Sequence, residues 1–295
     1  MCELSFRKIE LSDKNRAQEL LQKSNYRGCE YTFGNNFVWR DVYNVEVCFF
    51  EEFYFVKQLS GENTRFLFPA GAGETERAVK LIENFCIENN LKPRIFANYE
   101  KAEEITAIFP EYEANPIRDF NDYIYLADDL ENLKGKKYHS KRNHLNRFYE
   151  NEWSFEPITA ENLHECAALN ERWCEENLEV DDKGKQEEQI VVLQSIEHFK
   201  ELGYYGGIIR VNSEVEAFSM GERSADNCFV VHIEKASRKY QGAYAAINRE
   251  LVKSLRGKFL YINREDDAGS ENLRKAKLSY YPAFLEEKFC LTRRN

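Results

Sequence analysis

The 295-residue sequence has little of what marks disordered, repetitive or secreted chains. It contains 6 Pro and 14 Gly, and 43% of its residues are hydrophobic, so a disordered or collagen-like chain is excluded. The longest apolar stretch, 47–56, is interrupted by Glu51 and Glu52 and is far shorter than the ~20 residues that span a bilayer. The first ten residues carry charges throughout, so we expect no secretory signal and a cytoplasmic protein.

Close cysteine pairs are also missing. The eight cysteines form no C-x-x-C motif, and the nearest two, Cys166 and Cys174, are eight residues apart. A structural zinc site or a redox motif needs thiols that converge on one atom or bond, so neither is expected. The five His residues are scattered, and we predict no bound metal. Most cysteines are therefore expected to be reduced and buried.

Basic residues are in the minority, with 41 Lys and Arg against 51 Asp and Glu and a net charge of −10. This balance excludes a protein that coats nucleic acid. Residues 134–149 are the exception, because they contain six Lys or Arg, two His and no acid, which leaves −10 − 6 = −16 for the rest. A helix there could bind the phosphates of a nucleic acid or a lipid headgroup. The candidate residues are Lys137, Lys141, Arg142, His144 and Arg147. The alternative is a solvated helix between domains.

Apolar periodicity and turn residues predict two related α/β units, at residues 1–130 and 131–295, the second preceded by the basic helix 134–149. In the first unit we expect strands at 46–59, 64–68, 93–97 and 122–126 and helices at 14–23, 75–89 and 102–109. In the second we expect helices at 160–176, 244–255 and 271–278 and strands at 205–211, 214–222, 227–234, 259–263 and near 287–291. Each unit is expected to be a mixed, mostly antiparallel sheet flanked by helices.

A glycine-containing loop lies between a predicted strand and a predicted helix at 239–245. Backbone N–H groups at such a helix start can hold an anion. The loop resembles the one with which acetyltransferases of the GNAT fold hold the coenzyme A pyrophosphate, although Lys239 replaces Gln or Arg there. The candidate cofactor-binding residues are Tyr240, Gly242, Ala243 and Tyr244, with Asn263 and Lys275 from the next segment. The alternative is a glycine turn that opens a helix. A second glycine-rich loop, 69–74, lacks the spacing of a nucleotide loop and is interpreted as a plain loop.

Charged residues follow the predicted strand 259–263 directly, in the order Arg264, Glu265, Asp266 and Asp267. Ligands of open α/β sheets bind beyond the carboxyl ends of strands. Carboxylates there could hold an ammonium group, and Arg264 with Lys277 could stabilise an anion. The alternative is an acidic cap for the helix that begins near Glu271.

The predicted strand 227–234 carries two further candidates. Strict alternation places Phe229, Val231 and Ile233 on one face and His232 and Glu234 on the other. His232 and Glu234 are therefore candidate general bases or amine anchors, and a structural role is the alternative.

Three segments together resemble a known family: Lys141-Arg142-Asn143-His144, the loop and helix 240–250, and the run 263–278. The family comprises proteins related to the C-terminal catalytic domain of phosphatidylglycerol lysyltransferase. The resemblance implies two tandem GNAT-like domains, similar to the aminoacyltransferases that build peptidoglycan cross-bridges. It also implies transfer of an aminoacyl group from aminoacyl-tRNA to a hydroxyl or amine acceptor, with no further cofactor.

The resemblance also implies roles for particular residues. Arg264 and Lys277 would oppose developing negative charge, Glu265 or Asp266 would hold the aminoacyl ammonium, and residues 137–147 would bind tRNA phosphates. The lysyltransferases carry a membrane-embedded portion that this sequence lacks, so the acceptor stays open between a small molecule and a lipid headgroup, as does the oligomeric state. The alternatives are an acetyl-coenzyme A-dependent N-acetyltransferase and a non-catalytic binding module on the same fold.

Overall fold

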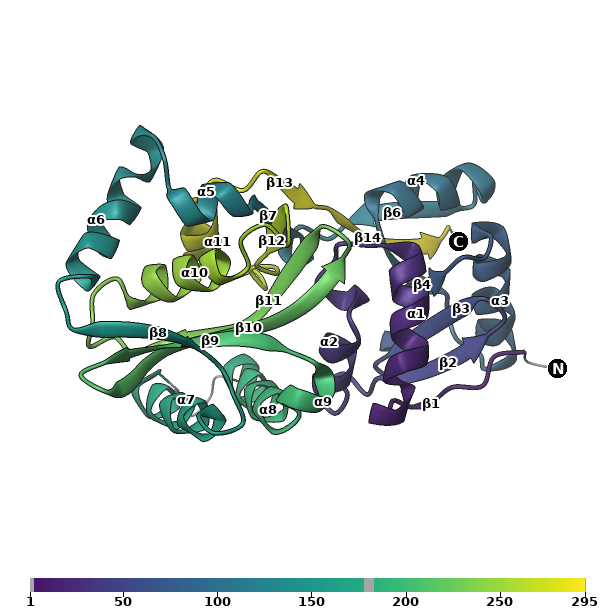
Figure 1. The fold of residues 1–295 in the computed structure, drawn as a ribbon. Coiled ribbons are helices and arrows are strands. Elements are labelled where there is room, and N and C mark those ends of the chain that lie inside the picture. Colours follow the sequence, from purple (N-terminus) through teal and green to yellow (C-terminus); the bar gives the residue numbers. More distant parts are fainter. Residues whose placement is uncertain (1–2, 178–182, 295) are drawn as a thin grey trace.

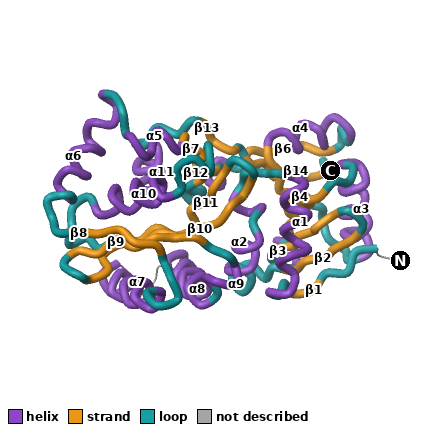
Figure 2. Tube along the Cα trace, in the orientation of Figure 1, coloured by secondary structure: helices purple, strands orange, loops and turns teal. Residues whose placement is uncertain are grey.

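The computed structural model describes residues 3–177 and 183–294, which form two sheets of seven strands with helices on their faces (Figures 1 and 2). The first sheet contains β1 (Arg7–Lys8), β2 (Glu46–Phe50), β3 (Phe53–Gln58), β4 (Arg65–Gly71), β5 (Arg94–Asn98), β6 (Tyr112–Pro116) and β14 (Lys288–Arg293). The second contains β7 (Asp122–Leu126), β8 (Trp153–Pro157), β9 (Tyr205–Val211), β10 (Glu214–Ala225), β11 (Cys228–Ala236), β12 (Tyr261–Asn263) and β13 (Phe284–Glu286). Their orders are β1-β2-β3-β4-β5-β14-β6 and β8-β9-β10-β11-β12-β7-β13.

The helices divide between the two sheets. They are α1 (Lys14–Ser24), α2 (Phe33–Val38), α3 (Thr75–Glu88), α4 (Tyr99–Ile108), α5 (Ala127–Asn132), α6 (His139–Phe148), α7 (Leu163–Asn177), α8 (Lys183–Glu197), α9 (Phe199–Leu202), α10 (Ala243–Ser254) and α11 (Glu271–Leu278). In the view of Figure 1, α10 with α5 and α6 covers the upper face of the second sheet, and α7, α8 and α9 lie beneath it. The second sheet is therefore enclosed on both faces.

Helix α3 illustrates how the sequence pattern becomes packing. Its Leu81, Ile82 and Phe85 recur at helical spacing and are buried against the first sheet. Burying side chains of this size contributes roughly 1.5–3 kcal/mol each. The helices expected at 14–23, 75–89 and 271–278 are confirmed to within one residue at either end.

The two sheets exchange a strand, which the sequence analysis did not predict. Strand β7, expected to close the first unit, pairs with β12 and β13 in the second sheet. The terminal strand β14, expected in the second unit, pairs with β5 and β6 in the first. The chain therefore crosses between the sheets near residue 121 and again near residue 287, and neither sheet is built from residues 1–130 or 131–295 alone.

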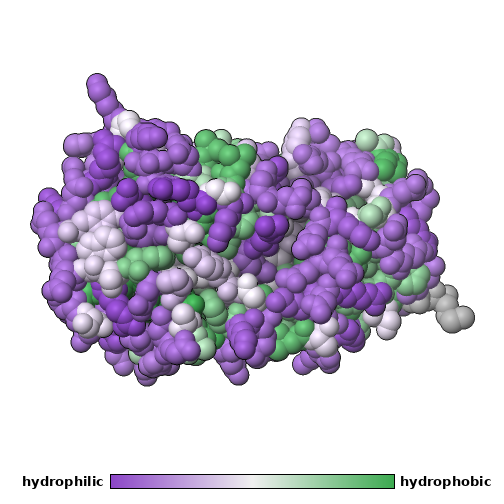
Figure 3. Space-filling model, in the orientation of Figure 1, coloured by the Kyte–Doolittle hydropathy of each residue, from purple (hydrophilic) through white to green (hydrophobic). Residues whose placement is uncertain are grey.

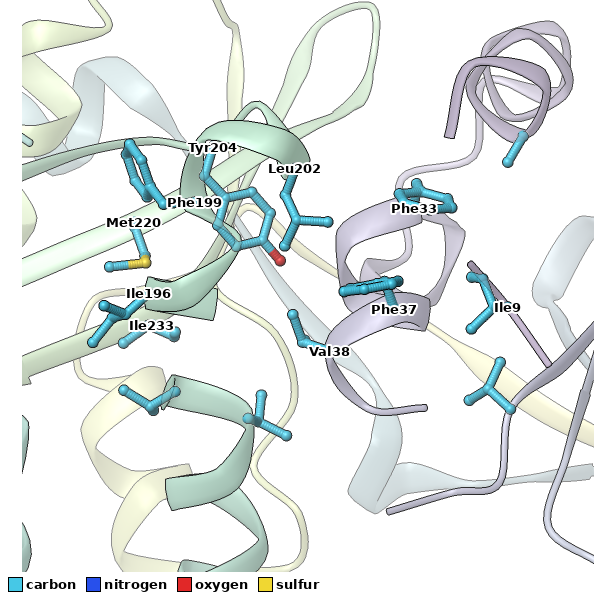
Figure 4. Packing of buried hydrophobic residues seen from close by; sticks show 14 of the residues in the cluster. Ile9, Phe33, Phe37, Val38, Ile196, Phe199, Leu202, Tyr204, Met220 and Ile233 are labelled. Carbon is cyan, nitrogen blue, oxygen red and sulfur yellow. The ribbon is translucent and has the colours of Figure 1, made fainter. Parts of the chain in front are cut away.

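A continuous hydrophobic core joins the two sheets. Phe33, Phe37 and Val38 of α2 pack in one cluster with Leu202 and Ile233 from the second half of the chain (Figure 4). The close-up shows α2 facing the end of α8 and α9 across this contact. Because the core passes through the junction, the two sheets are expected to unfold together.

The structure differs from the predicted elements in several further places. The strand expected at 46–59 is a hairpin, because Glu51 adopts a positive φ of 51° and reverses the chain between β2 and β3. The sequence analysis missed β1, α2, β6, α5, β8, α8, α9 and β13. The predicted basic helix 134–149 is a short 3-10 turn at Lys136–Tyr138 followed by α6.

The surface of the molecule and the burial of its cysteines bear on the predictions of no membrane span and of buried thiols. The face drawn in Figure 3 is largely hydrophilic with scattered apolar patches. Among the described helices, none combines the length and hydrophobicity needed to cross a membrane. Cys29, Cys48, Cys86, Cys166, Cys174 and Cys228 are buried, as expected, and Cys290 is half-buried; Cys2 lies outside the described residues.

Candidate functional site

The central feature of the second sheet is a gap between two parallel strands. Strands β11 and β12 pair over three residues only, from Cys228 opposite Tyr261 to Val230 opposite Asn263. Strand β11 continues to Ala236, whereas the chain after β12 turns toward β7, where the Arg264 N–H donates to the Tyr123 carbonyl at 3.0 Å. We call the region between residues 231–236 and residues 264–267 the strand gap.

Arg264 lies in the strand gap and is held from several sides. Its Nη2 donates to Glu234 Oε1 at 2.7 Å, and its guanidinium carbon lies 4.9 Å from the ring centre of Tyr280 and 5.8 Å from that of Tyr125. Asn248 of α10 donates to the other Glu234 oxygen at 3.1 Å. Arg264 Nη1 is buried and, among the described residues, has no hydrogen-bond partner. The gap therefore contains an ordered cation with an unused donor.

Lys141 of the basic helix lies close to Arg264 as well. The Lys141 ammonium lies 3.9 Å from the ring centre of Tyr280, whose ring also contacts Arg264. Burial and the neighbouring Arg264 charge lower the pKa of Lys141 to about 8. We refer to Arg264, Glu234, Tyr125, Tyr280 and Lys141 as the arginine cluster; it joins two segments that the sequence analysis treated separately.

A bulge in β11 overturns the predicted alternation. The register with β10 passes from Met220 opposite Ile233 to Gly221 opposite Val231, so His232 is the extra residue. As a consequence, Phe229 and Val231 belong to the core under α10, whereas Ile233 belongs to the core that joins the two sheets. The prediction that Ile233 shares a face with Phe229 and Val231 is therefore wrong.

His232 lies between two carboxylates. Its Nδ1 is 2.7 Å from Glu265 Oε1 and its Nε2 is 3.1 Å from Glu222 Oε1, and the side chain is 4% exposed. Burial alone would lower its pKa, but the hydrogen bonds and charges of Glu222 and Glu265 outweigh burial and raise the pKa to about 9. An imidazolium at neutral pH is a donor at both nitrogens, which makes it an anchor for carboxylates rather than a general base.

The sequence analysis missed Glu222. A simple two-residue hairpin between β10 and β11 would place Glu222 opposite Val231, but a register irregularity near Arg223 places it opposite Val230. Side chains two residues along on the neighbouring strand share a face, which brings Glu222 to His232. The sequence feature that could have pointed to Glu222 is the run of polar residues at the end of an otherwise apolar strand.

Lys277 holds the backbone of the loop that follows β12. Its Nζ donates to the carbonyl oxygens of Arg264, at 2.6 Å, and of Asp266, and burial lowers its pKa. Burial raises the pKa of Asp266 to about 7. Glu265, at a φ of 56°, adopts the left-handed conformation that turns its side chain to His232. Lys277 thus positions the loop backbone, whereas the sequence analysis expected it to stabilise an anion together with Arg264.

Two neighbouring residues, Asn263 and Asp267, are structural, and a third, Lys275, is exposed. Asn263 is buried and donates to the Arg27 carbonyl and to Asp122, both at 2.8 Å, which ties the loop to the first half of the chain. Asp267 accepts hydrogen bonds from Arg274, and these outweigh burial and hold its pKa well below the usual range. Lys275 is 75% exposed and its nearest acid is Glu271, at 3.7 Å. The structure does not bring Asn263 or Lys275 together with the 239–245 loop.

The predicted phosphate loop is packed against the basic helix. Gly242 has a φ of 93°, and a Cβ there would lie under 3.0 Å from the His144 carbonyl oxygen. Arg147 also donates to Gln241 at 2.9 Å. The glycine is therefore needed for the close approach of α6. Tyr244, beyond Ala243, accepts a hydrogen bond from Trp173 of α7 at 2.9 Å.

The remaining loop and basic residues differ in what they contact. Tyr240 is partly buried against the second core. Arg142 donates to the carbonyls of Leu133 and Gly135 and so caps its own segment. Lys137 lies 3.8 Å from Asp129 and is 46% exposed. Of the predicted phosphate-binding residues, Lys141 is the one that the structure places in the arginine cluster.

A second ionic cluster lies where the chain crosses between the sheets. The Lys288 ammonium is 2.7 Å from Asp122, 2.7 Å from Glu30 and 3.6 Å from the Cys29 sulfur. Those three acceptors are also the group of candidate metal ligands found among the described residues. Because the ammonium already occupies their shared centre, the cluster is interpreted as a buried ion-pair network that fixes β7 to β14.

Comparison with known proteins adds to this geometry. A family model described as phosphatidylglycerol lysyltransferase, C-terminal, matches residues 21–292. A conserved protein of unknown function from Bacteroides thetaiotaomicron is 33% identical with a TM-score of 0.94, over 99% of this chain and 100% of that one. A curated uncharacterised protein of Mycoplasmoides gallisepticum is 21% identical over 197 residues, and the match spans 61% of that protein's length.

More distant structures are similar in fold. The C-terminal domain of a putative lysylphosphatidylglycerol synthetase from Agrobacterium fabrum is 12% identical, with a TM-score of 0.68 over 96% of this chain and 92% of that one. FemX is 10% identical, with a TM-score of 0.60 over 97% and 96%. The predicted fold class, two tandem GNAT-like sheets flanked by helices, is confirmed.

Proposed function

Since the chain belongs to the phosphatidylglycerol lysyltransferase C-terminal family, whose members are acyltransferases, we propose that it transfers an aminoacyl group from aminoacyl-tRNA to a hydroxyl or amine acceptor. In this reaction the acceptor oxygen or nitrogen bonds to the ester carbonyl carbon. The bond from that carbon to the ribose oxygen breaks, and the acceptor's proton ends on the ribose hydroxyl. Negative charge develops on the carbonyl oxygen in between.

The observation that carries the proposal is the unused Arg264 donor in the strand gap. Nη1 is buried without a partner among the described residues, while Glu234 and the Tyr280 ring fix the guanidinium. A buried donor that is already oriented stabilises an oxyanion without reorganisation. In the proposed mechanism Arg264 contacts the ester carbonyl oxygen, and Glu234 is a positioning residue.

The acidic residues of the loop suit the ammonium group of the aminoacyl donor. Glu265 uses Oε1 for His232, and its neighbour Asp266 has a pKa raised to about 7 by burial. An ammonium ligand would favour the ionised form of Asp266. We assign ammonium binding to this pair and the positioning of their backbone to Lys277.

The basic helix gives the tRNA a route to the strand gap. Lys137, Arg147 and the half-buried His144 lie on or beside α6, and Lys141 of the same helix is part of the arginine cluster. Phosphates bound along α6 would place the acceptor end near Arg264. The net charge of −10 restricts this attraction to one surface.

The packing of the 239–245 loop argues against acetyl-coenzyme A as the donor. The α6 backbone approaches Gly242 so closely that a Cβ would not fit, at the helix start where a pyrophosphate would bind. The Tyr244 side chain extends from there to Trp173.

A transfer assay tests the proposal. Purified protein is incubated with tRNA charged with radiolabelled amino acids and with a cell extract that supplies acceptors. We expect label to move from tRNA to an extractable product with the wild type and with Lys275→Ala, whose side chain is exposed outside the cluster. No transfer above the buffer rate, with any charged tRNA, would contradict the proposal.

A further inference from the structure

The junction between the two sheets contains a pocket that the proposed reaction does not use. Its volume is about 180 Å³, and it lies between α1, the start of α2, the α9–β9 turn and the end of β10. Its walls mix apolar and polar side chains: Lys14, Gln18, Leu21, Gln22, Tyr31, Phe33, Leu202, Glu222 and Asp226 are among them. A cavity of ~150 Å³ holds a benzene-sized molecule, so this pocket suits a ligand of roughly six to ten non-hydrogen atoms.

Glu222 is the buried charge of the pocket wall. Its side chain is 7% exposed, and Oε1 is used by His232 at 3.1 Å. Among the residues described in the structure, none donates to Glu222 Oε2 or pairs with it. Gly34 of α2 approaches so closely that a Cβ there would lie under 3.0 Å from Glu222 Oε1, so α2 holds the carboxylate in place. A fixed carboxylate with one free oxygen is prepared for a charged donor.

The other charges around the pocket are mixed, because Lys14, Arg223 and Asp226 line it together with Glu222. The Lys14 ammonium donates to the Glu201 carbonyl at 2.6 Å, and the Arg223 guanidinium lies over Phe259, 5.4 Å from its ring centre. Both lining cations therefore have other contacts. Asp226 is exposed at the rim, and within the described part of the chain its carboxylate has no ion pair. Glu222 and Asp226 supply the carboxylates among the residues that line the pocket.

We propose that this pocket binds a small primary amine, with the ammonium on Glu222 Oε2 and the carbon chain between Leu21, Phe33 and Leu202. A carboxylate at a partly apolar wall binds an ammonium through a charge-assisted hydrogen bond and rejects an anion of the same size. The site goes beyond the proposed transfer and does not depend on it, because it lies on the pocket side of His232 and needs neither tRNA nor Arg264.

Calorimetric titration of the intact protein with molecules matched in size tests this assignment. The probes are n-butylamine and L-lysine, with n-butanol and butyrate as partners that lack the ammonium group or reverse the charge. We expect at least one amine to bind with a Kd in the millimolar range or tighter, and at least tenfold weaker binding of butanol and butyrate. Equal affinity for butanol, or no binding of either amine at 20 mM (roughly ten times the weakest Kd expected), would overturn the proposal.

Variants localise the binding. Glu222→Gln removes the counter-charge and is expected to weaken amine binding at least tenfold, whereas Glu214→Gln, on the exposed start of the same strand, leaves it unchanged. Because Glu222→Gln also removes a partner of His232, Gln22→Trp serves as a second variant. It fills the pocket from the exposed face of α1 without touching His232, and it should abolish binding. A Gln22→Trp variant that binds amines with wild-type affinity would overturn the assignment of the pocket. The transfer assay does not depend on whether this variant binds amines, so the two proposals can fail separately.

Discussion

The two sheets repeat one strand order but differ in what fills the equivalent gap. In each, a run of antiparallel strands ends in a parallel pair joined by a helix, β4–α3–β5 in the first and β11–α10–β12 in the second. The next strand in each sheet comes from the other half of the chain, β14 in the first and β7 in the second. The backbone therefore offers two related openings.

Apolar side chains surround much of the first opening, with Lys101 lying over the Phe68 ring. Phe68, Ala70 and Ala97 are all buried around it, and the loop that follows β4 packs tightly. A Cβ on Gly71 would lie under 3.0 Å from the Glu52 carbonyl oxygen in the β2–β3 turn, and one on Gly73 equally close to the Phe53 ring, so these glycines are needed for packing. The second opening contains the arginine cluster instead. The comparison shows that the fold supplies the gap twice and that, among the described residues, the arginine cluster lies at the second.

The largest expected effect comes from removing the charge that distinguishes the second gap. Arg264→Ala should lower the transfer rate about 10²- to 10³-fold, since an oriented oxyanion donor contributes that much. Lys101→Met is the matched change at the first gap, where the Lys101 ammonium lies 5.2 Å from the Phe68 ring, and it should leave the rate within about twofold. Single-turnover transfer rates measure both, and equal losses would contradict the difference between the gaps.

A smaller effect is expected from His232. Its pKa is raised to about 9, so its stabilising contribution is fully present below about pH 6.5 and is lost as the pH rises through about 9. His232→Asn should therefore destabilise the protein by roughly 3 kcal/mol at pH 6, and by much less at pH 9.5. Urea unfolding at both pH values measures the difference. A penalty that does not change with pH would show that His232 is not charged in the folded protein.

Lys141 is expected to act in the opposite direction on stability. Its pKa is lowered to about 8, so burial of the charged form is unfavourable below pH 8 and is relieved as the pH rises from 8 to 10.5. Lys141→Met should stabilise the protein by roughly 1 kcal/mol at pH 7, after allowance for its partial exposure, and should reduce transfer. Lys275→Met is the exposed control and should change neither quantity. Destabilisation of Lys141→Met at pH 7 would contradict the account.

The smallest effect is expected on the outer side of the basic helix. The double variant Lys137→Gln, Arg147→Gln removes two cations and should weaken tRNA binding about threefold to tenfold, with a salt dependence shallower by roughly two units. Lys80→Gln on α3, beside the first sheet, is the matched control. Filter binding at several salt concentrations measures the slope, and an unchanged slope would remove α6 from the tRNA path.

Local pattern predicted much of the fold but not the way the strands are shared. Helix α11 follows from a Ser270 cap, whose Oγ accepts from the Leu273 N–H, and α3 follows from its apolar spacing. The exchange of β7 and β14 depends on hydrogen bonds between residues far apart in the chain, such as Phe284 opposite Ile124. Periodicity within a segment carries no information about its partner.

The site was predictable where chain order alone places its residues, and not where strand register or tertiary packing places them. Arg264 and Glu265 follow a strand end, which chain order reveals, and Glu234 lies on the neighbouring strand. The bulge at His232 and the register irregularity near Arg223 bring Glu222 to the site, and neither has a sequence signal of its own. Lys141 reaches Arg264 through Tyr280, a contact that only tertiary packing provides.

Photo-crosslinking tests most directly the central claim that chemistry occurs at the second gap. A tRNA acceptor end carrying a non-hydrolysable, diazirine-labelled aminoacyl group is bound to the intact protein and irradiated, and the modified peptides are identified by mass spectrometry. The account predicts labels on Tyr125, Tyr280 or residues 264–267, which line the second gap. Labels around Phe68 and Lys101 at the first gap, or none above the level seen with uncharged tRNA, would contradict it.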